Sequence, residues 1–172
     1  MSLIAETERL FIRELNTSDA AFALELVNTP GWLQNIGDRK VYNLEQAEQY
    51  LLNGPIKSYE VNGFGIWLLE LKADQTRIGL CGIIKREGLD LPDLGYALLP
   101  AYEGKGYVTE AASAVLNYSK QTLHIPEILA ITNQDNEHSI KVLEKQGFAF
   151  EKNYTLPGET TLLRMFRWTA KD

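Results

Sequence analysis

The sequence predicts an α/β fold in which one mixed sheet carries helices on both faces. Along the 172 residues, segments with the two-residue apolar period of a strand alternate with segments that have the apolar spacing of a helix. The first half contains two apolar runs joined by a short polar loop, which is typical of an antiparallel hairpin. The second half contains a strand, a loop, a helix and another strand, an order that favours a right-handed crossover and a parallel pair.

The first half is expected to hold one opening strand, two helices and the hairpin. A Thr-Pro-Gly sequence is expected to stop the first helix. Asn43 can cap the second helix, and Gly54-Pro55 is expected to end it. These elements are the strand at residues 8–15, the helices at about 18–28 and 43–53, and the hairpin strands at 65–71 and 77–85.

The second half is expected to hold two strand–helix units and two closing strands. Asn136 can cap the last helix, and Gly147 is the residue type that usually follows a helix end. These elements are strands at residues 94–99 and 128–132, helices at about 108–121 and 136–146, and strands at 148–150 and 162–168.

The composition fits a soluble domain, and its length suits one domain that spans residues 1–172. A net charge of −6 makes nucleic acid an unexpected partner, because phosphate-backbone binders usually carry a basic face. No apolar run approaches the roughly 20 residues that cross a bilayer. The single cysteine, Cys81, excludes an internal disulfide and a cysteine-ligated metal site. We therefore expect a cytoplasmic protein with no membrane partner and no metal.

A glycine-containing turn between a strand and a helix is the most informative stretch. Glycine allows positive φ angles and a close approach to a ligand, and the first turn of a helix has free N–H groups that favour anions. The stretch fits neither a P-loop nor a dinucleotide fingerprint, whose third glycine would fall at Thr109. A plain tight turn is the alternative to a phosphate site. The amides expected to bind phosphate are those of Gly104, Lys105, Gly106, Tyr107 and Val108.

The stretch from Pro100 to Ala111, which reads PAYEGKGYVTEA, resembles the acetyl-CoA loop of the GNAT acetyltransferase superfamily. It is most similar to the RimJ/RimL-like branch, whose best-known members acetylate the N-termini of ribosomal proteins. Ala101 departs from the Gln or Arg that often leads this loop, and Glu103 departs from the Gln that is frequent in the branch. Other similar stretches occur in order at Thr7–Arg13, Ile36–Arg39, Asp93–Tyr96 and Asn136–Phe148.

The resemblance implies a mostly antiparallel sheet of about seven strands, with a central splay between the fourth and fifth strands. It also implies an N-acetyltransferase in which a neutral primary amine attacks acetyl-CoA directly. The amine can belong to a protein N-terminus or to a small molecule, and the protein can be a monomer or a homodimer. Two other classes remain open, namely a catalytically silent acyl-CoA-binding or regulatory module and an enzyme that binds ATP or NAD.

The catalytic candidates follow from this resemblance and from the needs of acyl transfer. Ser139 is the candidate acid for the departing thiolate, although serine is also common at helix starts. A tyrosine that many superfamily members carry further along this helix is absent here. Asp93 is the first candidate for the base because it begins the fourth strand, although it could be an exposed turn residue. Glu87 and Glu70 are weaker candidates for the base.

The remaining expected contacts concern the oxyanion, the acceptor and the cofactor. A backbone amide near Leu98 is expected to donate to the oxyanion. Trp32 and Tyr42 either form walls of the acceptor site or are ordinary core aromatics. The expected cofactor-binding residues are Leu98, Leu99, Gly104, Lys105, Gly106, Tyr107, Val108, Thr109, Asn136 and Ser139.

Overall fold

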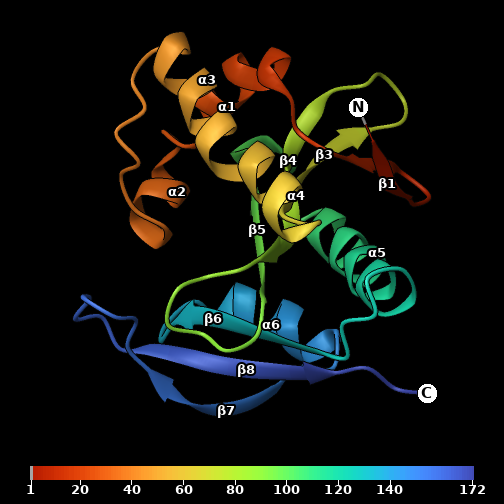
Figure 1. The fold of residues 1–172 in the computed structure, drawn as a ribbon, viewed down its shortest axis with the longest axis vertical. Coiled ribbons are helices and arrows are strands. Elements are labelled where there is room, and N and C mark those ends of the chain that lie inside the picture. Colours follow the sequence, from red (N-terminus) through yellow and green to blue (C-terminus); the bar gives the residue numbers. More distant parts are fainter. Residues whose placement is uncertain (1) are drawn as a thin grey trace.

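The computed structural model describes residues 2–172 and contains one eight-stranded sheet (Figure 1). The strands lie in the order β1-β2-β3-β4-β5-β6-β8-β7, and every neighbouring pair is antiparallel except β5 and β6. The mixed, mostly antiparallel sheet is therefore confirmed. The strands are β1 (Leu3–Glu6), β2 (Leu10–Arg13), β3 (Ile66–Leu71), β4 (Arg77–Ile84), β5 (Asp93–Leu98), β6 (Glu127–Asn133), β7 (Ala149–Tyr154) and β8 (Leu163–Thr169).

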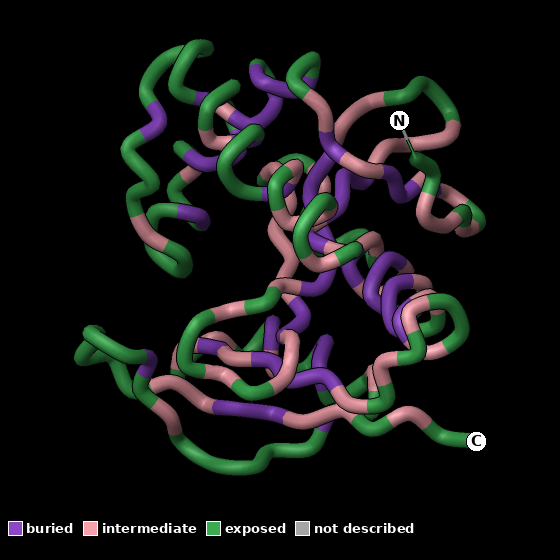
Figure 2. Tube along the Cα trace, viewed as in Figure 1, coloured by how far each residue is buried: buried purple, intermediate pink, exposed green. Residues whose placement is uncertain are grey.

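Helices cover both faces of the sheet, as predicted. One buried cluster joins α1, α2 and α3 to Leu68 and Leu80, and the other joins α5 and α6 to Trp67 and Cys81. Buried residues follow the central strands and the inner side of α5 in Figure 2. The helices are α1 (Ala20–Leu26), α2 (Pro30–Asn35), α3 (Leu44–Leu51), α4 (Lys57–Asn62), α5 (Tyr107–Gln121) and α6 (Glu137–Lys145), with short helical segments at Thr17–Asp19, Leu52–Ile56 and Pro100–Tyr102. None of the helices in residues 2–172 has the length and apolar character needed to cross a bilayer.

Of the two expected helix stops in the first half, the one at Gly54-Pro55 is wrong. α1 ends at Leu26, before Thr29-Pro30-Gly31 as expected, but these residues then begin an additional helix, α2. Thr29 caps α2 by accepting the Trp32 N–H, and Pro30 begins that helix, where its missing N–H is not needed. Beyond α3 the chain continues through a π-helical segment that contains Pro55, and the helical stretch ends only at Gly63, which has a left-handed φ of 78°. A wider π turn accommodates a residue that cannot donate a backbone hydrogen bond.

The expected opening strand is interrupted. Residues 8–15 contain only β2, and the additional strand β1 precedes it, so that the sheet has eight strands rather than about seven. Thr7 and Leu10 form the turn between them, with the Thr7 N–H donating to the Leu10 carbonyl at 2.9 Å. The hairpin, both strand–helix units and the Asn43 and Asn136 caps are confirmed.

The sheet splays open between β5 and β6. Their register contains one pair, Asp93 with Leu129, and the Leu129 N–H donates to the Pro92 carbonyl at 2.9 Å. Beyond this point β5 runs upward through the molecule in Figure 1, whereas β6 runs across its lower part. These are the fourth and fifth strands of the expected order, so the predicted central splay is confirmed.

Candidate active site

The turn before α5 presents a row of backbone N–H groups that have no protein acceptor. Gly104 and Gly106 have φ angles of 74° and 83°, and no side chain caps the helix. Within residues 2–172, no hydrogen bond uses the N–H groups of residues 104–109. Successive free amides at the positive end of a helix form an anion site.

A cavity of about 170 Å³ opens at this turn. Six of the expected cofactor residues line it, together with His138 and Val142 of α6, which sequence reasoning missed. Leu99 is not among the lining residues, because its side chain packs toward the α1–α3 face. The six residues are Leu98, Gly104, Gly106, Tyr107, Val108 and Thr109.

Arg9 braces the turn from the start of β2. Its guanidinium donates to the Lys105 carbonyl at 3.0 Å and to Glu110 at 2.8 Å, and it lies 4.1 Å from the centre of the Tyr107 ring. Thr7 also donates to Glu110. Burial opposes ionisation of Glu110, but these hydrogen bonds hold its pKa below the ordinary value. The negative charge near the turn is therefore matched by Arg9, and the backbone amides remain available for an anion.

The β5 edge of the splay offers further backbone N–H and C=O groups. The Leu99 N–H donates to Ile78 of β4 at 2.8 Å, and hydrogen-bonded residues alternate along an antiparallel pair. It follows that Tyr96 and Leu98 direct their N–H and C=O groups away from β4, toward the open side. The predicted amide donor near Leu98 therefore lies on an unpaired strand edge.

A hydroxyl pair lies on the cofactor side of β5. The Tyr96 hydroxyl is 2.5 Å from the Ser139 Oγ and 3.2 Å from the Ser139 carbonyl oxygen. Both residues are largely shielded, and burial raises the pKa of Tyr96 to about 12. The Asn136 side chain accepts the Ser139 N–H at 3.2 Å, so it fixes the start of α6. Sequence reasoning missed Tyr96. Residues two positions apart in a strand share a face, so Tyr96 lies with Leu94 and Leu98 on the face that α6 covers.

Asp93 lies where β5 and β6 part. Its side chain is 1% exposed and accepts two hydrogen bonds from Arg86, each of 3.2 Å. Burial raises the pKa of Asp93, and the Arg86 charge opposes that rise. Alternation along β5 directs Asp93 toward the α1–α3 face, opposite Tyr96. Of the two weaker candidates, Glu70 pairs with Arg13 at 3.2 Å and Glu87 is exposed.

The two aromatic candidates for the acceptor site are separated. Trp32 is buried in the cluster on the α1–α3 face, and its Nε1 has no hydrogen-bond partner in residues 2–172. Tyr42 is exposed and donates its hydroxyl to Asp38 at 2.8 Å. Within the described chain, no three His, Cys, Asp or Glu side chains come together in a way that could hold a metal ion.

Comparison with known proteins agrees with this geometry. Residues 9–149 match the family model described as an acetyltransferase (GNAT) domain. Two Bacillus subtilis proteins are similar in sequence. The uncharacterized N-acetyltransferase YoaA is 26% identical over 149 residues, which cover 86% of this chain and 84% of that protein. The uncharacterized protein YkkB is 32% identical over 92 residues, which cover 52% of this chain and 54% of that protein.

Solved acetyltransferases share the fold. An acetyltransferase from Agrobacterium tumefaciens superimposes with a TM-score of 0.83 at 22% identity, covering 99% of this chain and 95% of that one. RimL, a ribosomal alpha-N-protein acetyltransferase in complex with coenzyme A, gives a TM-score of 0.81 at 17% identity, with 98% of each chain covered. Because the family model covers most of the sequence, the chain belongs to the GNAT family of N-acetyltransferases, which use acetyl-CoA.

Proposed function

We propose that the chain is a one-domain, cytoplasmic acetyltransferase of the RimJ/RimL-like branch, which acetylates a primary amine on a protein N-terminus or a small molecule. The observation that carries this proposal is the row of free amides at residues 104–109 beside the open edge of β5. An acetyl thioester held there supplies an activated acyl group. A monomer and a homodimer are both compatible with this activity.

The residues present fit acetyl-CoA. The amides of Gly104 to Thr109 match the several oxygens of a diphosphate, and the glycines leave the backbone accessible. The free N–H and C=O groups of Tyr96 and Leu98 match an amide-containing arm that runs along the strand. We therefore assign diphosphate binding to the turn and arm binding to the β5 edge, with Asn136 and Ser139 at the adjoining start of α6.

The reaction requires an amine without its proton and a donor for the oxyanion. The incoming ammonium loses one proton, its nitrogen bonds to the carbonyl carbon, and the carbon–sulfur bond breaks. The amide near Leu98 donates to the oxyanion. Asp93 is the proposed base, because burial raises its pKa and a carboxylate with a raised pKa is a stronger proton acceptor. Since Arg86 engages both of its oxygens, Asp93 would act through a water molecule.

Ser139 and Tyr96 are proposed to stabilise the departing sulfur together. A thiol has a pKa of about 8.5, so a Tyr96 hydroxyl with a pKa of about 12 does not surrender its proton fully to a thiolate. Both hydroxyls therefore act as hydrogen-bond donors, with Tyr96 orienting Ser139. As the amide forms, the attacking nitrogen loses its second proton, and one proton is taken up by the departing sulfur, which leaves as the CoA thiol. This assignment supplies a hydroxyl that compensates for the missing helix tyrosine.

The hydroxyl pair gives a kinetic prediction. Ser139→Ala is expected to lower kcat by about tenfold or more and to change CoA affinity by less than about threefold, because a hydrogen bond to a charged atom is worth about 1.5–3 kcal/mol. Tyr96→Phe should give a similar loss of kcat, and the double variant should lose less than the product of the two effects. Stopped-flow turnover and calorimetric CoA binding measure these quantities. Unchanged turnover in Ser139→Ala would remove its proposed role.

A thiol-release assay tests the activity itself. Acetyl-CoA and a panel of amines, comprising peptides with free N-termini and small primary amines, should give CoA release that depends on the amine. Mass spectrometry should show one added acetyl group on the accepted amine. Acetyl-CoA binding without turnover on any amine would favour a catalytically silent acyl-CoA-binding module. The pairing of Asp93 with Arg86 is the observation that favours this alternative, because it occupies the carboxylate that is proposed as the base.

The acceptor is proposed to approach from the α1–α3 face. Trp32 is buried there with an N–H that has no partner, and buried polar groups usually have one. This supports Trp32 as a wall of the acceptor site. Tyr42 is proposed to contribute through Asp38, since its hydroxyl bond holds the loop before α3. The Asn133 side chain of β6 donates to Asn35 of α2 at 3.3 Å, so α2 reaches across to the other half of the sheet.

A further inference from the structure

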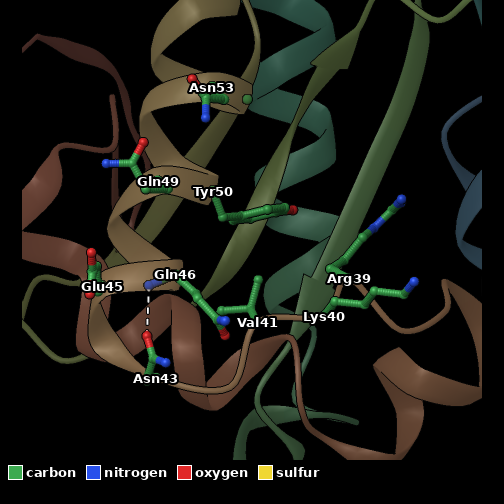
Figure 3. A pocket seen from close by; sticks show the side chains of 10 residues that line it. Arg39, Lys40, Val41, Asn43, Glu45, Gln46, Gln49, Tyr50 and Asn53 are labelled. Atoms are coloured by element: carbon green, nitrogen blue, oxygen red, sulfur yellow. Dashed lines mark hydrogen bonds between the residues drawn. The ribbon is translucent and has the colours of Figure 1, made fainter.

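A second, larger cavity lies on the face of the sheet opposite the phosphate turn. Its volume is about 620 Å³, and it lies between α3 and the loop that precedes that helix (Figure 3). Val41 and Tyr50 contribute both to its lining and to the cluster on the α1–α3 face. The two cavities therefore border the buried clusters on opposite faces of the sheet.

Two cations dominate the charge of this second cavity. Arg39 and Lys40 are exposed, line the cavity, and form no ion pair within residues 2–172. Figure 3 shows both side chains extending to the side of α3 toward which the Tyr50 ring points, whereas Glu45 points away from them. Burial raises the pKa of Tyr50, and the Arg39 charge opposes that rise, which indicates that this guanidinium lies near the phenol.

The loop that carries these cations is held in one conformation. Lys40 has a left-handed φ of 57°, which costs free energy for any residue with a side chain. The Asp38 carboxylate accepts the Lys40 N–H at 2.7 Å and the Tyr42 hydroxyl at 2.8 Å. Gln46 of α3 accepts the Tyr42 N–H at 2.7 Å. The Asp38 charge is thus used within the loop, and the loop backbone that carries the two cations is held beside the cavity.

We propose that this cavity selects acceptor amines that carry an anionic group, with Arg39 and Lys40 binding a carboxylate or a phosphate of the acceptor. The inference rests on the proposed acetyl transfer, because the bound amine must reach the splay. A net charge of −6 gives the protein no general attraction for anions, so this selectivity is local to the loop. The same two charges would repel a polycationic amine.

Matched amines test the proposal on the full chain. One arm compares the tripeptides Ser-Glu-Glu and Ser-Gln-Gln, and the other compares phosphoethanolamine with ethanolamine. If the acceptor is a peptide, kcat/KM is expected to be about tenfold or more higher for Ser-Glu-Glu than for Ser-Gln-Gln. If it is a small molecule, the same difference is expected between phosphoethanolamine and ethanolamine. An Arg39→Gln, Lys40→Asn double variant should remove this preference while retaining turnover of the neutral member. Asparagine suits position 40 because it tolerates the left-handed conformation.

A binding measurement keeps the test independent of turnover. Calorimetry on the CoA complex should show tighter binding of the anionic member, and the double variant should lose this difference. Lys152→Gln, which removes an exposed cation on β7, is the matched control and should keep the preference. Equal binding of both members in both arms, or a preference that survives in the double variant, would overturn the inference. Turnover of neutral amines without any anionic preference would overturn it while leaving the acetyl transfer intact.

Discussion

Replacing Gly106 with glutamate is expected to abolish CoA binding. Gly106 has a φ of 83°, and a Cβ added there would lie 3.4 Å from the Arg9 Nη2. A side chain in the left-handed region costs about 1–2 kcal/mol. A carboxylate at the turn also repels the diphosphate and covers the amides that bind it. Together these effects predict that the Kd for CoA rises at least about 100-fold, which corresponds to roughly 3 kcal/mol.

Two variants separate the causes of this loss. Gly106→Ala introduces only the Cβ and should weaken CoA by about tenfold. Gly158→Glu adds the same side chain at a similar φ of 76° in the loop between β7 and β8, where a Cβ meets nothing within 4 Å, and should leave CoA affinity unchanged. Calorimetry with CoA, together with circular dichroism to verify folding, measures each effect. A folded Gly106→Glu protein with normal CoA affinity would disprove the assignment of the turn.

The sequence predicted the cofactor turn well because its chemistry is local. Two glycines that need positive φ, a strand before them and an amphipathic helix after them lie within the 28 residues from Leu94 to Gln121. The splay also followed from the family resemblance. By contrast, the helix stop at Pro55 was wrong and the helix that begins at Pro30 was missed, because proline is compatible with a π-helical segment and with the first turn of a helix.

The contacts that support the site join residues far apart in the sequence. Arg9 and Glu110 are separated by 101 positions, and Tyr96 and Ser139 by 43. No periodicity in one segment specifies which residue of another segment it will meet. The alternation of β5 could have shown which face Tyr96 occupies, but only the crossover geometry brings α6 over that face. Asp93 likewise gained its partner Arg86 from a loop that has no repeating pattern.

The other large effect concerns a buried charge network that fixes the α1–α3 layer to the sheet. Asp19 is fully buried and accepts two hydrogen bonds of 3.0 Å from Arg13 of β2. Arg77 of β4 donates to the same carboxylate at 2.6 Å, and the Asn16 N–H donates at 2.9 Å. Arg13 also pairs with Glu70 of β3 at 3.2 Å. Because α1 begins directly after Asp19, this network positions the layer that covers β5.

Asp19→Asn is expected to lower the free energy of unfolding by about 3 kcal/mol at pH 7, since breaking a buried ion pair costs about 3–5 kcal/mol and Glu70 still compensates Arg13 in part. For a chain of this length the loss corresponds to a Tm lower by about 6–12 °C. Glu151→Gln breaks the half-exposed pair with Arg167 and is the matched control, with an expected loss below about 1 kcal/mol. Urea unfolding and calorimetry measure both.

The stability that Asp19 contributes is expected to depend on pH. Burial opposes ionisation of Asp19, but hydrogen bonds from Arg13, Asn16 and Arg77 outweigh it and lower the pKa of Asp19. A carboxyl with a lowered pKa stabilises the fold fully above its unfolded pKa of about 3.9, and this stabilisation is lost as the pH falls through the folded pKa. Asparagine does not titrate in this range. The difference in the free energy of unfolding between the native protein and Asp19→Asn should therefore be constant from about pH 5 to 7 and should shrink below pH 4. A difference that persists unchanged at pH 2 would show that packing, and not the charge of Asp19, holds the layer in place.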